Sequence, residues 1–94
     1  MENEKINQLI HEKIMNLKVS KPSDYADSIS FAWKVVERME KRGYLWDAGK
    51  DFKEYFMDFY RADNQQPQNH NVGCAYEFPK AICLAALKAV GENV

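Results

Sequence analysis

The chain holds few residues of the types that bind metals or attack substrates. It has two histidines and two cysteines, and the one close pair among them is His70 with Cys74. A zinc site needs three or four such ligands, usually at short and regular spacing. His11 and Cys83 lie at a distance and do not extend the pair into that pattern. The sequence therefore predicts no metal site, and no motif points to a cofactor.

The same residues are the only source of a Cys-His catalytic pair. A catalytic cysteine lies in a polar, electropositive and accessible place. Cys74 and Cys83 instead both occur in apolar runs. We therefore expect both to be reduced, buried thiols.

Four carboxylates are spread over a segment that we expect to form a β-hairpin, and most of them should be surface charges. Asp58 differs, because it lies between Phe56 and Tyr60 on a face that we expect to be covered. If Asp58 is buried, it needs a partner such as Arg61 or a backbone donor. The alternative is a carboxylate at the rim of the sheet, paired with a lysine. No convergent polar cluster emerges, so we expect a protein that is not an enzyme. The four residues are Asp47, Asp51, Glu54 and Asp58.

The start of the last predicted helix offers a possible anion site. Lys80 falls in its first turn, and the N-terminus of a helix is a natural place for a negative group. A polar stretch at 62–71 precedes it, and together these residues could hold a nucleotide-like ligand. The alternative is a surface loop that is simply polar. The candidate ligand residues are Tyr60, Arg61, His70, Asn71, Tyr76 and Lys80.

Apolar residues at spacings of three and four predict two N-terminal helices. The first spans 3–18, and the second spans 24–42, capped by Ser23 or Asp24. Trp33 falls on the apolar stripe of the second helix, where a tryptophan buries a large area. We therefore expect Trp33 to be a core anchor.

From residue 44 the apolar period changes from helical to two. Strands are predicted at 44–48 and 53–60, joined by a hairpin of four to five loop residues, and a third short strand at 72–76. The stretch before the third strand is too polar to enter a core, so we expect a surface loop there.

The last helix is predicted at 79–90, because Pro79 fits its first turn and Gly91 its end. Small residues recur inside it at every fourth position. Such a row lets a helix lie close against a sheet or another helix. The row consists of Ala81, Ala85 and Ala89.

These elements predict a single α/β (α+β) domain over 1–94, in the order helix, helix, strand, strand, strand, helix. The second strand carries aromatic residues on both sides, and a sheet that is apolar on both faces needs cover on both. We therefore expect a three-stranded antiparallel sheet with helices on both faces. Two aromatic faces and a small core also favour a homo-oligomer, with Tyr44 and Trp46 as candidate interface residues.

The composition excludes several classes of protein. Thirteen basic and fourteen acidic residues leave a net charge of −1, whereas proteins dominated by nucleic-acid binding show a basic face. No apolar run is long enough to span a membrane, and no signal peptide is recognisable. We therefore expect a cytoplasmic protein.

Three segments of the chain resemble the phage ABA sandwich domain, a family of small proteins of phages and prophages that infect mainly Gram-positive bacteria. The resemblance implies the fold and a phage origin, and it implies no active site because none is assigned to the family. The N-terminal segment Leu9–Met15 resembles the family's opening helix. The other two segments are Asp27–Met39, with its Ala-Trp-x-Val-Val pattern, and Pro79–Val90, with Pro-x-Ala-Ile-Cys-x-Ala-Ala-Leu.

Small phage accessory proteins of this kind frequently counter host immunity. The sequence therefore suggests a non-catalytic binding module that antagonises host defence, either by binding a defence protein or by sequestering a nucleotide-derived signal. The alternative is a structural or regulatory phage protein that associates with other phage components.

Overall fold

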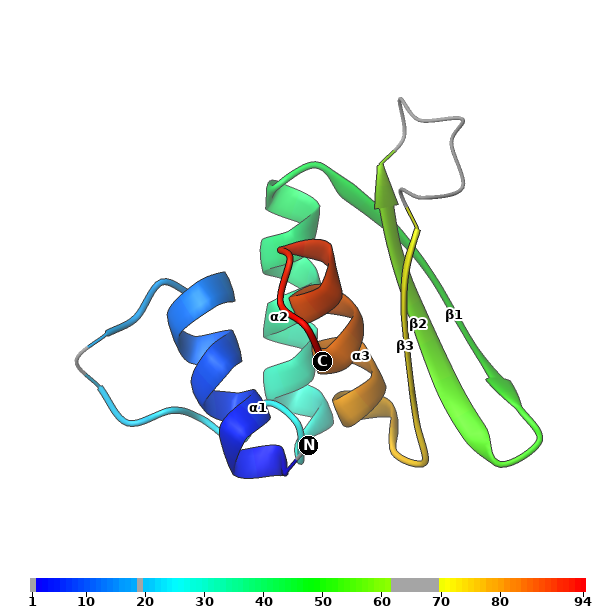
Figure 1. The fold of residues 1–94 in the computed structure, drawn as a ribbon, viewed down its shortest axis with the longest axis horizontal. Coiled ribbons are helices and arrows are strands. Elements are labelled where there is room, and N and C mark those ends of the chain that lie inside the picture. Colours follow the sequence, from blue (N-terminus) through cyan, green and yellow to red (C-terminus); the bar gives the residue numbers. More distant parts are fainter. Residues whose placement is uncertain (1, 19, 62–69) are drawn as a thin grey trace.

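The computed structural model describes residues 2–18, 20–61 and 70–94, and Figure 1 shows its helices lying beside a β-sheet. The strands form an antiparallel sheet in the order β1-β2-β3. The predicted α+β class, the antiparallel sheet and the order of helices and strands are confirmed. The elements are α1 (Asn3–Leu9), a π-helical turn η1 (Ile10–Ile14), α2 (Ile29–Lys41), β1 (Tyr44–Asp51), β2 (Glu54–Arg61), β3 (Asn71–Ala75) and α3 (Phe78–Ala89).

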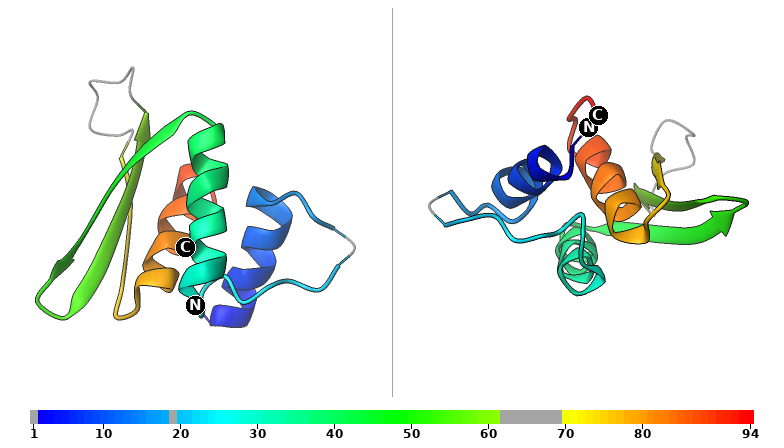
Figure 2. Two further views of the ribbon diagram at one scale, coloured as in Figure 1. Left: turned by 180° about the vertical axis from the view of Figure 1, so that it is seen from behind. Right: turned by 90° about the horizontal axis from the view of Figure 1, so that it is seen from below.

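The helices stack on one face of the sheet (Figures 1 and 2). Helix α3 packs against β2 and β3, α2 packs beside α3 and against β1, and α1 with η1 packs on the far side of α3. The other face of the sheet carries no helix in the described part of the chain, which differs from the expected cover on both faces. The reason lies in α3, which is apolar nearly all round and draws the first helix onto itself.

Helix α3 approaches β3 most closely at Gly73. A Cβ atom at this position would lie 2.5 Å from the carbonyl oxygen of Ala81 and still closer to the backbone nitrogen of Ala85. The alanine row predicted for this helix therefore does allow a close approach, and Gly73 is its counterpart on the strand. Because backbone atoms of both elements meet here, neither can turn aside to make room for a side chain.

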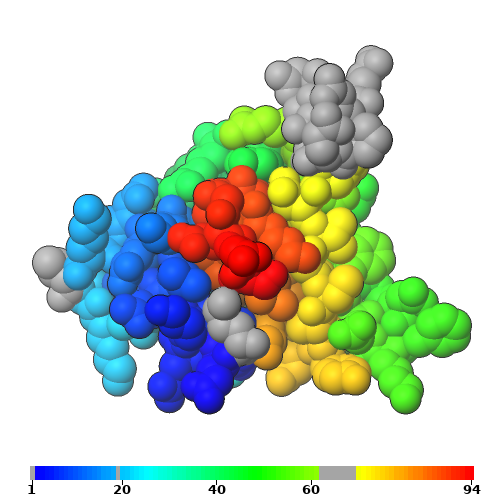
Figure 3. Space-filling model, in the orientation of Figure 1, coloured from blue at the N-terminus to red at the C-terminus, as the bar shows by residue number. Residues whose placement is uncertain are grey.

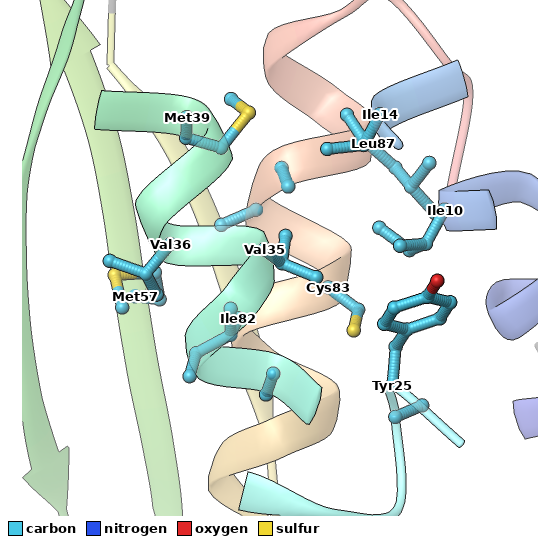
Figure 4. Close-up of a cluster of buried hydrophobic side chains, with 14 of the residues drawn as sticks. Ile10, Ile14, Tyr25, Val35, Val36, Met39, Met57, Ile82, Cys83 and Leu87 are labelled. Atoms are coloured by element: carbon cyan, nitrogen blue, oxygen red, sulfur yellow. The ribbon is translucent and has the colours of Figure 1, made fainter. Parts of the chain in front are cut away.

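The core fills the space between the sheet, the pair of helices α2 and α3, and the first helix (Figure 4). The sheet contributes Met57 and Phe59, and all the side chains at the centre are fully buried. Cys83 of α3 points toward the ring of Tyr25 (Figure 4), and burial raises the pKa of both the Cys83 thiol and the Tyr25 hydroxyl. The helices contribute Ile6, Ile10, Ile14, Val35, Val36, Met39, Ile82 and Leu87.

The segment before α2 anchors the first helix and is not itself the start of a long helix. Helix α2 begins at Ile29, with an extended Ser28 before it, and not at 24 as the sequence predicts. The backbone N–H of Ala26 donates to Oδ1 of Asn7 at 2.8 Å, and the Tyr25 hydroxyl lies 3.1 Å from Nδ1 of His11. Tyr25 and Ala26 are both buried in these contacts, and their burial outweighs the capping signal of Ser23 and Asp24.

Two further predictions about the N-terminal helices differ from the structure. The first helix ends after η1, because Asn16 takes a left-handed conformation (φ 57°) that breaks the helix predicted to run to 18. Trp33 was expected in the core, but it lies at an exposed edge of α2, with its ring centroid 5.6 Å from that of Trp46. Val35 of the same helix is fully buried instead.

Gly73→Ala should destabilise the fold by about 3 kcal/mol, at the upper end for an overpacked core, because the clash is between two backbones. Gly49→Ala is the matched control. There the added Cβ meets only the rim of the Phe56 ring, 2.7 Å from Cε1, on the helix-free face. Urea unfolding followed by tryptophan fluorescence gives both values. A smaller loss for Gly73→Ala than for Gly49→Ala would contradict the argument.

Stability should fall as the pH rises above about 9. A thiol whose pKa is raised by folding stabilises the native state fully below its ordinary value of 9.0, and that contribution is lost as the pH climbs toward the folded value. Cys83→Ala should therefore flatten the alkaline slope of the free energy of unfolding by up to about 1.4 kcal/mol per pH unit. Cys74→Ala, at the exposed cysteine, is the control and should leave the slope unchanged. Equal slopes for both variants would refute this account.

Candidate functional site

One face of the sheet, the open face, is free of described helices. Its residues alternate along the strands with the buried Met57 and Phe59, and the strand register places them side by side. Leu45 is 46% exposed and Val72 39% exposed, which is unusual for apolar residues inside a sheet. The open face consists of Leu45, Asp47, Gly49 and Asp51 of β1, Glu54, Phe56, Asp58 and Tyr60 of β2, and Val72 and Cys74 of β3.

At one end of the open face, Asp58 joins β2 to the start of β3. Nδ1 of His70 donates to Oδ2 of Asp58 at 2.7 Å, and the backbone N–H of Asn71 donates to Oδ1 at 3.0 Å. The ring of Tyr60 lies beside that of His70, with centroids 5.1 Å apart. Asp58 is half-buried, and a backbone donor is one of the two kinds of partner expected for it if it were buried. A histidine, and not Arg61, supplies the side-chain partner.

A carboxylate-oriented imidazole is the arrangement that positions a catalytic base. Such a base acts on a nucleophile within hydrogen-bond reach. Cys74 lies on the open face, but it follows His70 by four residues, which is roughly 13 Å at strand spacing. In the described ranges, no three metal-ligating side chains gather at one place. The pair of Asp58 and His70 is thus positioned to fasten two strands together.

The six residues predicted to bind a ligand fall into separate groups. Tyr60, His70 and Asn71 lie together where β2 ends and β3 begins, whereas Tyr76 and Lys80 follow β3 at its other end. The polar stretch between Arg61 and His70, residues 62–69, lies outside the described residues. Arg61 points to the helix side of the sheet, where its guanidinium lies 4.3 Å from the ring of Tyr44 and donates to the carbonyl oxygen of Arg42.

Tyr76 and Lys80 line a shallow groove of about 360 Å³ at the edge of the sheet. Glu54 and Glu77 line the same groove, so two carboxylates surround the lysine there. A phosphate would meet more negative than positive charge at this place. The groove therefore does not suit the anionic ligand for which Lys80 was selected.

The predicted interface aromatics face the helices and not the surroundings. The hydroxyl of Tyr44 donates to the carbonyl oxygen of Ala89 at 3.2 Å. Nε1 of Trp46 donates to Oε2 of Glu40 at 3.1 Å. Both side chains are half-buried and hold the helix layer to β1, which gives them a role inside this protein. Cys74 was expected to be buried, and it is exposed on the open face.

Phe52, which forms the tip of the hairpin with Lys53, is not among the residues predicted from the sequence. Its side chain is 95% exposed, and its backbone is left-handed (φ 52°). The hairpin projects from the body of the molecule (Figure 3). The sequence predicts a hairpin loop of four to five residues after the strand at 44–48, but β1 runs on to Asp51 and leaves a turn of two residues. A bulky residue in a left-handed conformation is strained, and such strain is found at functional sites.

Phe52→Gly should stabilise the protein by about 1 kcal/mol, because glycine removes the left-handed strain and no packing is lost at an exposed tip. Lys53→Gly is the matched control in the same turn. Its backbone has no positive φ, so added flexibility alone should make it neutral or slightly destabilising. Thermal unfolding of the two variants checks this. A destabilised Phe52→Gly would show that the phenylalanine packs against its surroundings.

The chain matches known proteins by sequence and by fold. The model of the phage ABA sandwich domain family matches residues 4–87. The chain belongs to the phage ABA sandwich domain family. Its fold is similar to the crystal structure of a phage protein from Bacillus cereus ATCC 14579, at 25% identity and a TM-score of 0.82. That match covers all of this chain and 92% of the other. No curated protein matches this sandwich domain.

Membership of the phage ABA sandwich family confirms the resemblance stated above. The matched range takes in the three helices and all three strands up to Leu87. Among the described helices, none has the length and apolar character needed to cross a membrane.

Proposed function

We propose that this phage ABA sandwich protein is a non-catalytic binding protein that antagonises host defence, and that it acts by docking its open face on a host defence protein. The observation that carries the proposal is the open face itself, a sheet surface with exposed apolar residues that no helix of the described residues covers. Exposed apolar surface of this kind marks interaction sites in soluble proteins.

The shape of the surface supports a protein partner over a nucleotide. Ligand sites for small molecules are concave and enclose most of the ligand. The grooves at the sheet are shallow, and the residues selected for a nucleotide lie at opposite ends of β3. The open face instead places apolar side chains among polar ones on a broad sheet, as protein interfaces do.

Phe52 supports the same proposal from the hairpin tip. Binding energy at protein interfaces concentrates in a few large side chains that fill pockets on the partner. Phe52 is almost fully exposed, and its backbone has a left-handed conformation that glycine would adopt at lower cost. A docking role gives a reason for that cost. The hairpin would thus extend the open face and anchor it.

The proposed action needs no chemistry, because a small protein bound to a defence protein blocks it by occupancy alone. It places the protein in the host cytoplasm, where intracellular defence proteins act. The competing hypothesis, a structural or regulatory role on other phage components, uses the same surface with a different partner. Infection assays separate the two.

The double variant Leu45→Ser with Val72→Ser should lose the protein's activity during infection. A phage that lacks the gene is supplied with each variant and plated on its host and on the same host stripped of its defence genes. We expect plating to fall about tenfold or more, as for loss of an interface anchor, and only on the host that retains its defences.

The matched control is Leu17→Ser with Ile29→Ser, which removes two comparably exposed apolar residues outside the sheet. It should plate like the wild type on both hosts. A loss of plating on both hosts for the open-face variant would favour the phage-component hypothesis. Normal plating of that variant everywhere would refute a role for the open face.

A further inference from the structure

The open face carries only one sign of charge on its strands. Its ten strand positions include four carboxylates and neither lysine nor arginine. The register sets Asp47 directly opposite Asp58, and Asp51 directly opposite Glu54. Like charges in directly opposed positions destabilise a sheet. In the first pair, Asp58 also has His70 as a partner. The second pair, Asp51 and Glu54, is exposed.

This clustering does not follow from the composition, because the whole chain has nearly as many basic as acidic residues. The basic residues of the same strands lie elsewhere. Nζ of Lys50 lies 5.1 Å from the centre of the Tyr55 ring, on the helix side, and Arg61 lies over Tyr44 on that side too. Lys53 and Lys80 lie only at the rim, in the turn and in the groove beside β3. The negative charge is therefore a property of this surface.

The carboxylates alternate with aromatic and aliphatic side chains. The ring of Phe56 crosses onto β1 and lies against Gly49, where even a Cβ would approach its Cε1 to 2.7 Å. Tyr60, Leu45 and Val72 continue this apolar surface. Arginine suits such a surface, because its planar guanidinium forms paired hydrogen bonds with carboxylates and stacks on aromatic rings.

We propose that the open face binds a basic, arginine-bearing segment of its protein partner. This inference rests on the proposed function and names the chemistry of the partner at the same surface. The charge also argues against a second copy of the chain as the occupant. Two open faces brought together would set four carboxylates against four, and such juxtaposition disfavours association.

The test uses the whole protein and a defined probe, a short synthetic peptide that alternates arginine with valine. Its counterpart, with glutamate in place of arginine, reports on apolar binding alone. Amide NMR spectra are recorded while each peptide is added at low and at high salt. We expect the arginine peptide to shift amides of β1 and β2 and to bind more weakly at high salt, and the glutamate peptide to cause no shift.

Two variants with the same change of net charge decide whether the binding is specific. The first neutralises the open face by Asp47→Asn, Asp51→Asn and Glu54→Gln, and it keeps Asp58 because that residue fastens β3. The second removes three helix carboxylates, by Glu4→Gln, Glu12→Gln and Glu37→Gln, all of them exposed. The open-face variant should lose about tenfold or more in affinity, whereas the helix variant should stay within about twofold.

Several outcomes would overturn the inference. These are no binding of the arginine peptide, equal losses for the two variants, or a dimer in native mass spectrometry that the Leu45→Ser, Val72→Ser variant abolishes. Plating of phage with the open-face neutral variant separates this inference from the proposed function. If that variant still protects phage while the Leu45→Ser, Val72→Ser variant does not, the face binds a protein but its charge is not used.

Discussion

The close contact between α3 and β3 at Gly73 is the constraint on which the rest of the structure depends. At this point two backbones lie too near to admit even a methyl group. This close approach brings α3 into the centre of the molecule. Its side chains are buried against the sheet on one side and against the first helix on the other. The helices of the described residues all gather around α3, and none of them covers the second face of the sheet. The open face is therefore a consequence of how tightly α3 packs.

Much of this fold could be predicted because it follows from local rules. Pro79 and Gly91 mark the ends of the last helix to within a residue or two, and the alternation after Gly43 reveals the strands. Tertiary contacts decide the rest. The capping signal at Ser23 and Asp24 is overridden because Tyr25 and Ala26 are needed to hold the first helix. No local pattern reveals such a requirement.

The candidate site could be predicted less well, for a related reason. The sequence indicates aromatic residues on both sides of β2, but it does not say which side receives the helices. Tyr44 and Trp46 were therefore assigned to an interface, while their side of the sheet is the covered one. Asp58 and His70 were both singled out, yet their pairing depends on the register of β2 and β3. Phe52 was missed because its conformation, and not its residue type, makes it unusual.

The central position of α3 also governs how the chain gains its structure during synthesis. This helix follows every other described element in the sequence, yet all the layers meet on it. The first helix meets α2 and the segment at Tyr25 and Ala26 earlier, but its packing is incomplete until α3 has left the ribosome. Contacts between such distant segments form slowly, and the waiting segments expose surface that can aggregate. The slow step of folding would thus be the docking of α3, on which the other layers meet.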